Sequence, residues 1–274
     1  MRKTLTAGLT AGLVLAAGVA LPAQAISSST ADLSVLHAIP GLTVDVYVDG
    51  ARTLDDFTPG TLAGPLDVPA GEHVVAITAA DATDASSPVL GPVTLTLEAN
   101  ASYTAVANLD AAGKPALNSY KNDISATKAG EGRLTVRHTA AAPAVDVLAG
   151  GSPVVRNLEN PKEATLDLAA GTVSAAVALA GTTDPVIGPA DVTVKDGTLT
   201  VVYAWGSAAD GNLALAVQEV ATAHTNPGGV PSGTAGYAAQ RDATTQALWI
   251  TGSALVLTAG VAATVLVRRR RTES

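Results

Sequence analysis

Residues 33–50 read LSVLHAIPGLTVDVYVDG, and residues 134–151 read LTVRHTAAAPAVDVLAGG, an ungapped match at an offset of 101 positions. His37 aligns with His138, and both segments continue to a Val-Asp-Val tripeptide and end in glycine. A segment that returns within one chain indicates that the same supersecondary unit is built twice. The sequence therefore predicts two copies of one domain.

Alternation of apolar and polar side chains predicts that each copy is made of strands. In the first copy it runs along residues 44–49, 75–79, 93–97 and 103–107, with a last short strand expected near Leu117. A period of two is typical of strands with one face in a core, and Asp-Gly, Pro-Gly and Gly-Pro pairs between the runs are turn signals. About seven short strands in a copy of roughly 90–95 residues fit an immunoglobulin-like sandwich. We predict an all-β fold with two tandem immunoglobulin-like β-sandwich domains.

The second copy keeps the order of the first. Three further segments match: 66–71 with 166–171 at an offset of 100, 89–92 with 186–189 at 97, and 101–106 with 197–202 at 96. The shrinking offset places small deletions in loops, where a sandwich tolerates them. The predicted domains span residues 31–124 and 132–221, joined by a short polar link.

Four motifs of the first copy resemble the domain of unknown function 4397 family. They are Val35-Leu-His37, VDVYVDG at 44–50, LDVPAG at 66–71 and ASYT at 101–104. The second copy departs from the pattern: Leu148 replaces the Tyr, Gly150 replaces the Asp, and Pro143 has no matching proline at Leu42. The resemblance covers both copies and implies a β-sandwich without a known activity. It also implies a bacterial surface or secreted chain, often from high-GC Gram-positive (actinobacterial-type) organisms.

The first 25 residues have the pattern of a signal peptide. Arg2 and Lys3 supply a positive start, residues 5–21 form an apolar run, and Ala23-Gln-Ala25 is a small-x-small cleavage site. The predicted mature chain begins at Ile26.

A second apolar run lies near the other end of the sequence. Residues 247–267 carry no charge, and Arg268 to Arg271 follow directly. This length crosses a bilayer as a helix, and the arginines hold the tail in the cytoplasm. We predict a single transmembrane helix at 247–267 with a basic cytoplasmic tail at 268–274, so that the chain contacts the lipid bilayer through this helix.

Residues 222–246 lack an apolar period and are rich in Pro, Gly and Thr, which predicts a flexible stalk. Val230 to Thr234 resembles a scrambled sortase signal, but the Thr-Gly order of a true signal is reversed. The expected location is the cell membrane, single-pass, with the N-terminal region extracellular. Attachment to the cell wall is the alternative.

Composition narrows the classes of partner. The chain has no cysteine, which excludes disulfides and thiolate chemistry. Residues 26–246 carry 10 basic and 23 acidic side chains. Because like charges repel, this balance argues against nucleic acid as a partner of the exposed region.

The paired histidines are the sharpest candidates for a site. Leu134, Val136 and His138 share one strand face, so His138, and His37 by homology, should point inward. The favoured interpretation is a core histidine bonded to backbone groups at a turn. The alternative is that each histidine is a metal ligand or an acid–base group paired with Asp45 or Asp146. Alternation along the Val-Asp-Val strand places these aspartates on the face opposite the valines, which does not favour direct pairing.

Acidic loops are the other candidates. The carboxylates of Asp49, Asp55, Asp56, Asp81 and Asp84 are ligands of the type that Ca²⁺ prefers, but no D-x-D-x-D-G loop is present. The sequence also lacks G-x-S-x-G, P-loop and H-E-x-x-H motifs. We assign no catalytic, cofactor-binding or metal-binding residues and no cofactor. His37, Asp45, His138 and Asp146 are predicted to be structural residues of the family motif.

Two functional classes follow from these features. The first is a non-catalytic cell-envelope protein that displays two β-sandwich modules for binding, adhesion or spacing toward an envelope or extracellular ligand. The alternative is an extracellular enzyme or metal-dependent binder that uses His37, His138 and the acidic loops.

Overall fold

The computed structural model describes residues 28–222, and its regular secondary structure is β throughout. The first repeat contains β1 (Thr30–Ala38), β2 (Val44–Val48), β3 (Ala51–Phe57), β4 (Leu62–Pro69), β5 (Gly71–Ala79), β6 (Leu90–Leu97), β7 (Ser102–Leu109) and β8 (Pro115–Asn122). The second contains β9 (Glu131–His138), β10 (Val145–Ala149), β11 (Ser152–Leu158), β12 (Glu163–Ala169), β13 (Gly171–Leu179), β14 (Pro185–Val194), β15 (Thr198–Trp205) and β16 (Ala214–Ala221).

Several predictions concern residues at the two ends of the chain. The signal peptide, the stalk beyond Thr222, the transmembrane helix and the basic tail all lie outside the described residues. Within residues 28–222, no helix is long and apolar enough to cross a membrane.

A two-residue turn joins the Val-Asp-Val strand to its neighbour in both repeats. Asp49 and Gly50 have φ angles of 51° and 79°, and Gly150 and Gly151 have φ angles of 56° and 80°. Two central residues at positive φ are typical of the type I′ turn, whose twist matches that of a hairpin. The turn residues therefore fix the β2–β3 and β10–β11 hairpins in the same way.

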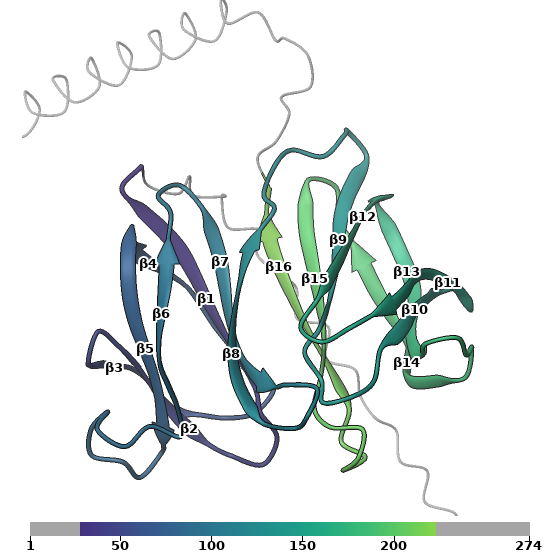
Figure 1. The fold of residues 1–274 in the computed structure, drawn as a ribbon. Coiled ribbons are helices and arrows are strands. Elements are labelled where there is room, and N and C mark those ends of the chain that lie inside the picture. The colour runs from purple at the N-terminus through teal and green to yellow at the C-terminus, as the bar shows by residue number, and fades with distance from the viewer. Residues whose placement is uncertain (1–27, 223–274) are drawn as a thin grey trace, which may run out of the picture. The chain divides into compact units, whose positions relative to one another are not determined.

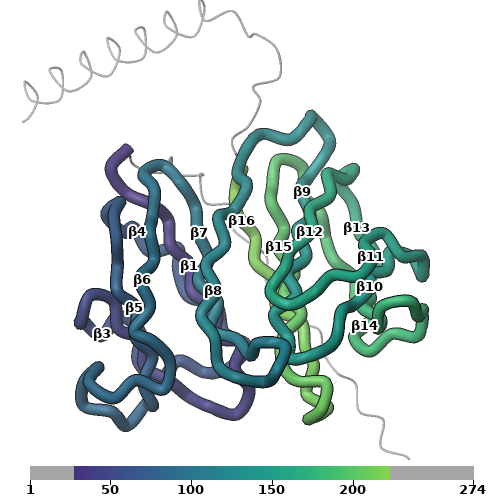
Figure 2. The backbone as a smooth tube through the Cα atoms, viewed as in Figure 1, coloured from purple at the N-terminus to yellow at the C-terminus, as the bar shows by residue number. Residues whose placement is uncertain are grey.

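Each repeat is a sandwich of two four-stranded sheets (Figures 1 and 2). In the first repeat the sheets have the orders β4-β1-β7-β8 and β3-β2-β5-β6. The second repeat has the same orders, β12-β9-β15-β16 and β11-β10-β13-β14. β1 pairs with β7 in parallel, as β9 does with β15, and the other strand pairs are antiparallel.

The prediction of an all-β fold is confirmed, and the paired sheets are consistent with two β-sandwich domains. The strand order differs from that of an immunoglobulin domain, in which the first two strands are neighbours in one sheet. Here β1 and β2 lie in different sheets, as do β9 and β10. Each repeat has eight strands rather than about seven, because residues 51–57 and 62–69 both form strands.

One predicted alignment is wrong by a single residue. Leu33 pairs with Tyr103, and the matching Leu134 pairs with Thr200, so the offset between β7 and β15 is 97 rather than 96. A slip of one residue exchanges the two faces of a strand. The sequence match had aligned Leu199 with Tyr103, whose side chain lies in the first core. Leu199 instead lies on the outer face of its own sandwich.

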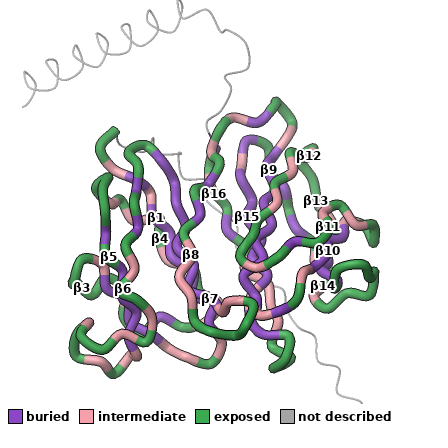
Figure 3. The backbone as a smooth tube through the Cα atoms, in the orientation of Figure 1, coloured by how far each residue is buried: buried purple, intermediate pink, exposed green. Residues whose placement is uncertain are grey.

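The inner faces of the two sheets form a separate core in each repeat. The first core includes Leu33, Val46, Ile77 and Tyr103, and the second includes Leu134, Val147 and Val177. Figure 3 shows the buried residues concentrated along the middle strands of the sheets. Burial of this apolar surface is the main source of stability in a chain without disulfides.

A third apolar cluster joins the two repeats. Its buried members are Leu36, Ala38, Val106 and Tyr120 from the first repeat and Leu199, Val201 and Tyr203 from the second. They lie on the outer faces of β4-β1-β7-β8 and β12-β9-β15-β16. These two sheets are therefore covered on both faces, and both sandwiches belong to one compact unit.

Candidate functional site

His37 and His138 lie in the last two positions of the first strand of each repeat, and each side chain hydrogen-bonds to backbone of the loop that follows. Both residues are 1% exposed. The Nε2–H of His37 donates to the carbonyl oxygen of Leu42 at 2.6 Å, and its Nδ1 accepts the Ile39 N–H at 3.5 Å. His138 repeats the arrangement with the Pro143 carbonyl at 3.0 Å and the Ala140 N–H at 3.3 Å. The prediction of equivalent, buried positions is confirmed.

This geometry requires neutral imidazoles. Each ring has one donor facing a carbonyl and one acceptor facing an N–H, which is the hydrogen-bonding capacity of the neutral form. Burial lowers the pKa of both histidines, and the carbonyl bond only partly opposes that effect. The ring of His37 also stacks on Phe57 with a centroid distance of 5.8 Å.

Asp45 and Asp146 do not contact the histidines; each binds backbone of its own sheet. Both are almost fully buried. Asp45 Oδ1 accepts the Asp56 N–H at 3.0 Å, and Asp146 Oδ1 accepts the Asn157 N–H at 2.8 Å. Asp56 and Asn157 adopt positive φ angles of 49° and 53° where the pairing register shifts. The aspartates therefore hold a residue of unfavourable backbone conformation at matching irregularities of β3 and β11.

The second oxygen of each aspartate has a different partner in the two repeats. Asp45 Oδ2 lies 3.1 Å from Arg52 Nη1, whereas Asp146 Oδ2 accepts the Gly181 N–H at 3.0 Å and lies 3.8 Å from Arg156 Nη1. The backbone N–H groups of Asn157 and Gly181 lower the pKa of Asp146. A carboxylate bound in this way is an anchor for the backbone and is not placed to exchange protons with His138.

The candidate acidic residues of the first repeat form separate local contacts, and Asp55 and Asp56 lie within β3 rather than in a loop. Asp55 pairs with Arg52 at 2.9 Å, and Asp84 caps the Ser86 N–H at 2.9 Å. Asp81 is exposed on the loop between β5 and β6. Within residues 28–222, no three His, Cys, Asp or Glu side chains are placed to hold a metal ion together.

Asp49 forms a pair with His73 that sequence reasoning missed. His73 Nδ1 lies 2.7 Å from Asp49 Oδ2, and His73 Nε2 lies 2.8 Å from the Pro69 carbonyl oxygen. Both ring nitrogens face acceptors, so only the doubly protonated ring satisfies both contacts. The hydrogen bond to Asp49 raises the pKa of His73, and bonds from Val74 and His73 lower the pKa of Asp49.

The pair is present in the first repeat alone among the described residues. The second repeat has Gly150 in place of Asp49 and Val173 in place of His73. The two positions change together, which is the signal in the sequence that could have identified the pair.

A second group missed from the sequence surrounds Arg137, between the repeats. Arg137 is 1% exposed. Its guanidinium donates to Glu163 Oε2 at 2.7 Å, to the Tyr203 hydroxyl at 2.8 Å and to Asn122 Oδ1 at 3.0 Å. It also lies 4.4 Å from the centre of the Tyr120 ring. A buried charge needs such partners, because its desolvation is costly.

These contacts continue into a closed ring of hydrogen bonds. The Tyr203 hydroxyl donates to Gln218 Oε1 at 2.5 Å, and Thr104 Oγ1 donates to the same oxygen at 3.0 Å. Asn122 Nδ2 donates to Thr104 Oγ1 at 3.2 Å and so completes the path back to Arg137. The ring, called here the Arg137 ring, takes Thr104 and Asn122 from the first repeat and Arg137, Tyr203 and Gln218 from the second.

Side chains around the ring also form hydrogen bonds to backbone carbonyl groups across the two repeats. Asn108 Nδ2 donates to the Thr139 carbonyl at 3.2 Å, and the Tyr120 hydroxyl donates to the Pro161 carbonyl at 2.9 Å. Asn160 Nδ2 donates to carbonyl oxygens of both repeats, Leu109 at 2.8 Å and Ala140 at 2.6 Å. Directional bonds of this kind fix the relative position of the sandwiches more strictly than apolar contact does.

Comparison with known proteins agrees with the resemblance seen in the motifs. No curated protein matches this chain. Residues 31–148 match the family model described as Domain of unknown function (DUF4397). The matched span contains His37, Asp45, His138 and Asp146.

Proposed function

We propose that this chain is a non-catalytic cell-envelope protein that displays two joined β-sandwiches outside the membrane for binding, adhesion or spacing. One observation carries the proposal: the polar residues that both repeats share are buried and hydrogen-bonded to backbone of their own repeat. His37 and His138 bond the loop after the first strand of each repeat, and Asp45 and Asp146 bond the backbone of β3 and β11. The polar residues common to both repeats therefore have hydrogen bonds that stabilise the sandwich.

The proposed location rests on the two ends of the sequence. Residues 1–25 have the pattern of a signal peptide, and residues 247–267 have that of a membrane anchor followed by four arginines. The module would stand outside the membrane on the stalk at 222–246. Wall attachment through Val230 to Thr234 is the competing outcome.

We further propose that both sandwiches are copies of the family's domain. The common strand orders, the shared I′ turns and the equivalent histidine contacts support this reading. The acidic balance of the exposed region favours an envelope or extracellular ligand over nucleic acid. Two sandwiches fixed to one another suit a contact or spacing role better than two freely moving ones, because the distance they span is constant.

Intact cells that express the full chain test the location. Protease added outside the cells is expected to remove residues 26–222 and to leave a membrane-bound fragment that contains residues 247–267. N-terminal sequencing of the undigested protein is expected to begin at Ile26. The Ala25→Phe variant, which removes the small residue at the cleavage site, should keep residues 1–25.

Two results would contradict the proposal on location. A mature wild-type protein that retains Met1 would exclude cleavage, and full protection from external protease would exclude display outside the membrane. Release of the protein by cell-wall hydrolases alone would instead support wall attachment.

The non-catalytic role has its own test on the fragment 26–225, which keeps every strand of the described residues and the cores of both sandwiches. Titration with Ca²⁺ and Zn²⁺ is expected to show no stoichiometric binding. Stoichiometric binding that is lost in His37→Ala and His138→Ala variants of normal thermal stability would establish the metal-dependent alternative.

A further inference from the structure

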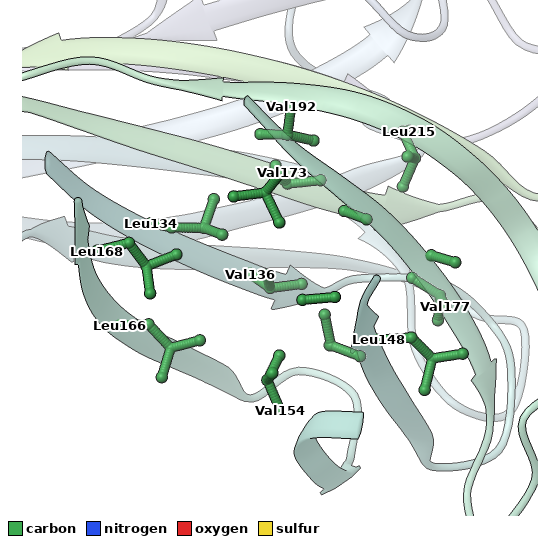
Figure 4. A pocket seen from close by; sticks show the side chains of 15 residues that line it. Leu134, Val136, Leu148, Val154, Leu166, Leu168, Val173, Val177, Val192 and Leu215 are labelled. Atoms are coloured by element: carbon green, nitrogen blue, oxygen red, sulfur yellow. The ribbon is translucent and has the colours of Figure 1, made fainter. Parts of the chain in front are cut away.

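The second sandwich contains a cavity that is lined entirely by hydrocarbon side chains. It lies between the two sheets and has a volume of about 60 Å³. Figure 4 shows side chains of Leu134, Val136, Val173, Val177 and Val192 around it, all without polar atoms. Apolar cavities of this kind stay dry, because a water molecule inside would have no polar partner.

The first repeat offers an internal comparison, since the strand registers equate every position. Six lining residues are smaller than their counterparts in the first repeat: Leu148 for Tyr47, Ala149 for Val48, Val173 for His73, Ala175 for Val75, Val177 for Ile77 and Val192 for Leu95. Two are larger: Val202 for Ala105 and Leu168 for Val68.

The second repeat also lacks one aromatic ring that packs in the core of the first repeat. Tyr103 packs in the first core, where its hydroxyl accepts the Glu98 N–H at 3.2 Å. Its counterpart Thr200 carries no ring, and its hydroxyl donates to the Thr193 carbonyl at 3.2 Å. The second repeat has thus exchanged several large core side chains for smaller ones without a change of fold, which is a costly exchange if nothing occupies the space.

The cavity reaches the surface at the edge formed by β11 and β12. Val154 on β11 lines the cavity and is 46% exposed, where the first repeat has Thr53. Leu166 and Leu168 on β12 also line it and are half-buried. An apolar residue that is exposed beside an apolar cavity provides an entrance for a hydrocarbon chain.

We propose that the second repeat binds the aliphatic chain of an amphiphile in this cavity, with the polar head group outside the entrance at Val154. The lining holds no side chain that could bond a polar group, so the buried part must be hydrocarbon. A cavity needs about 10–15 Å³ of this volume for each water-sized group, so about four to six methylene groups fit. This site does not depend on the proposed location of the protein, and either proposal can fail without the other.

The test is a titration of the 26–225 fragment with butanoate, hexanoate, octanoate and decanoate below their micelle concentrations, followed by methyl NMR. Saturable shifts are expected for the methyl groups of Val173, Ala175 and Val192. Affinity is expected to rise about fourfold for each added methylene, from about 0.8 kcal/mol per buried CH₂, until the cavity is full. Octyl glucoside should shift the same methyl groups, because the chain and not the head group is recognised.

Two variants restore residues of the first repeat. Ala175→Val together with Val192→Leu fills the cavity and should abolish saturable binding without a loss of thermal stability. Val154→Thr changes only the entrance and should weaken octanoate binding at least threefold, so it decides the matter if the filled variant fails to fold. Val74→Leu, at a residue 44% exposed in the first repeat, is the matched control and should bind like wild type.

The proposal is overturned if octanoate produces no saturable shift. It is also overturned if the filled variant folds and binds as well as wild type, or if the shifted methyl groups lie outside the cavity. Concentration-dependent dimerisation that buries Val154, measured by light scattering, would show that a second copy covers the entrance and would equally contradict it.

Discussion

At the scale of single residues, His37 and His138 stabilise the loop between the first two strands of each repeat. Each bonds the carbonyl oxygen of the residue five positions further along and an N–H two positions along, so one side chain fixes the connection between two sheets. The role requires a side chain with one donor and one acceptor at fixed separation, which neutral histidine supplies.

Replacement of His37 or His138 by alanine should therefore lower the free energy of unfolding by about 1–3 kcal/mol, the usual cost of a lost buried hydrogen-bonded group. Urea denaturation of the 26–225 fragment measures it. The exposed Glu72→Gln variant is the control and should change stability by less than about 0.5 kcal/mol. Unchanged stability in both histidine variants would mean that these bonds do not hold the loops.

The His73–Asp49 pair should make part of the stability depend on pH. The folded-state pKa of His73 is raised above 6.5, so its contribution is fully present below that value and is lost as pH rises through the folded pKa. The pKa of Asp49 is lowered by its hydrogen bonds from Val74 and His73, so the carboxylate is charged at both pH 6 and pH 9. The stability difference between wild type and Asp49→Asn should therefore be larger at pH 6 than at pH 9.

The comparison with a variant is needed because His37 and His138 act in the opposite direction. Their folded-state pKa values are lowered, so their protonation in the unfolded state reduces stability as pH falls through 6.5. These contributions cancel in the difference between wild type and Asp49→Asn. A difference that is the same at both pH values would show that His73 is not charged in the folded protein.

At the scale of strands, the sequence predicted most elements but not all of their faces. The alternation at 44–48 and the Asp49-Gly50 pair identified β2 and the turn that follows it, because both signals are local, but the partner strand β3 was not predicted. The β7 alignment failed by one residue because its small side chains differ little between the two faces. Its correct register is set by pairing with β1, which is distant in sequence.

The interface between the repeats was not predicted for a related reason. β1 is almost continuously buried, a pattern typical of strands covered on both sides. Periodicity assigned the inward faces of His37 and His138 correctly but cannot say what covers the other face. Leu36 and its counterpart Arg137 differ completely in chemistry, so comparison of the repeats gave no warning that both positions face the partner sandwich.

Arg137→Leu, which places the residue of the first repeat at this position, tests the Arg137 ring. We expect it to lower the free energy of unfolding by about 1–3 kcal/mol, because Asn122 Oδ1 and the Tyr203 hydroxyl lose a buried partner. Glu163 is 38% exposed and can turn to water, which limits the loss.

The control for this variant is Arg156→Gln, since the Arg156 side chain is 69% exposed and lies 3.8 Å from Asp146. Its stability should remain within about 0.5 kcal/mol of wild type. If Arg137→Leu is as stable as Arg156→Gln, the ring contributes to the position of the sandwiches but not to their stability.

At the scale of the whole molecule, the two sandwiches form one compact unit. The same sheet of each repeat faces the other, but the facing residues have become complementary: Arg137 stands where the first repeat has Leu36, and Tyr203 where it has Val106. Separation of the sandwiches would expose this apolar cluster and leave the Arg137 ring unbonded. Each repeat therefore depends on its neighbour for a part of its burial.

Differential scanning calorimetry of the 26–225 fragment tests this central claim most directly. The two sandwiches are expected to unfold in a single transition whose van't Hoff enthalpy equals the calorimetric enthalpy of the whole fragment, because neither half is complete alone. Two separable transitions, or a van't Hoff enthalpy near half the calorimetric value, would show instead that the repeats fold independently and would contradict the account.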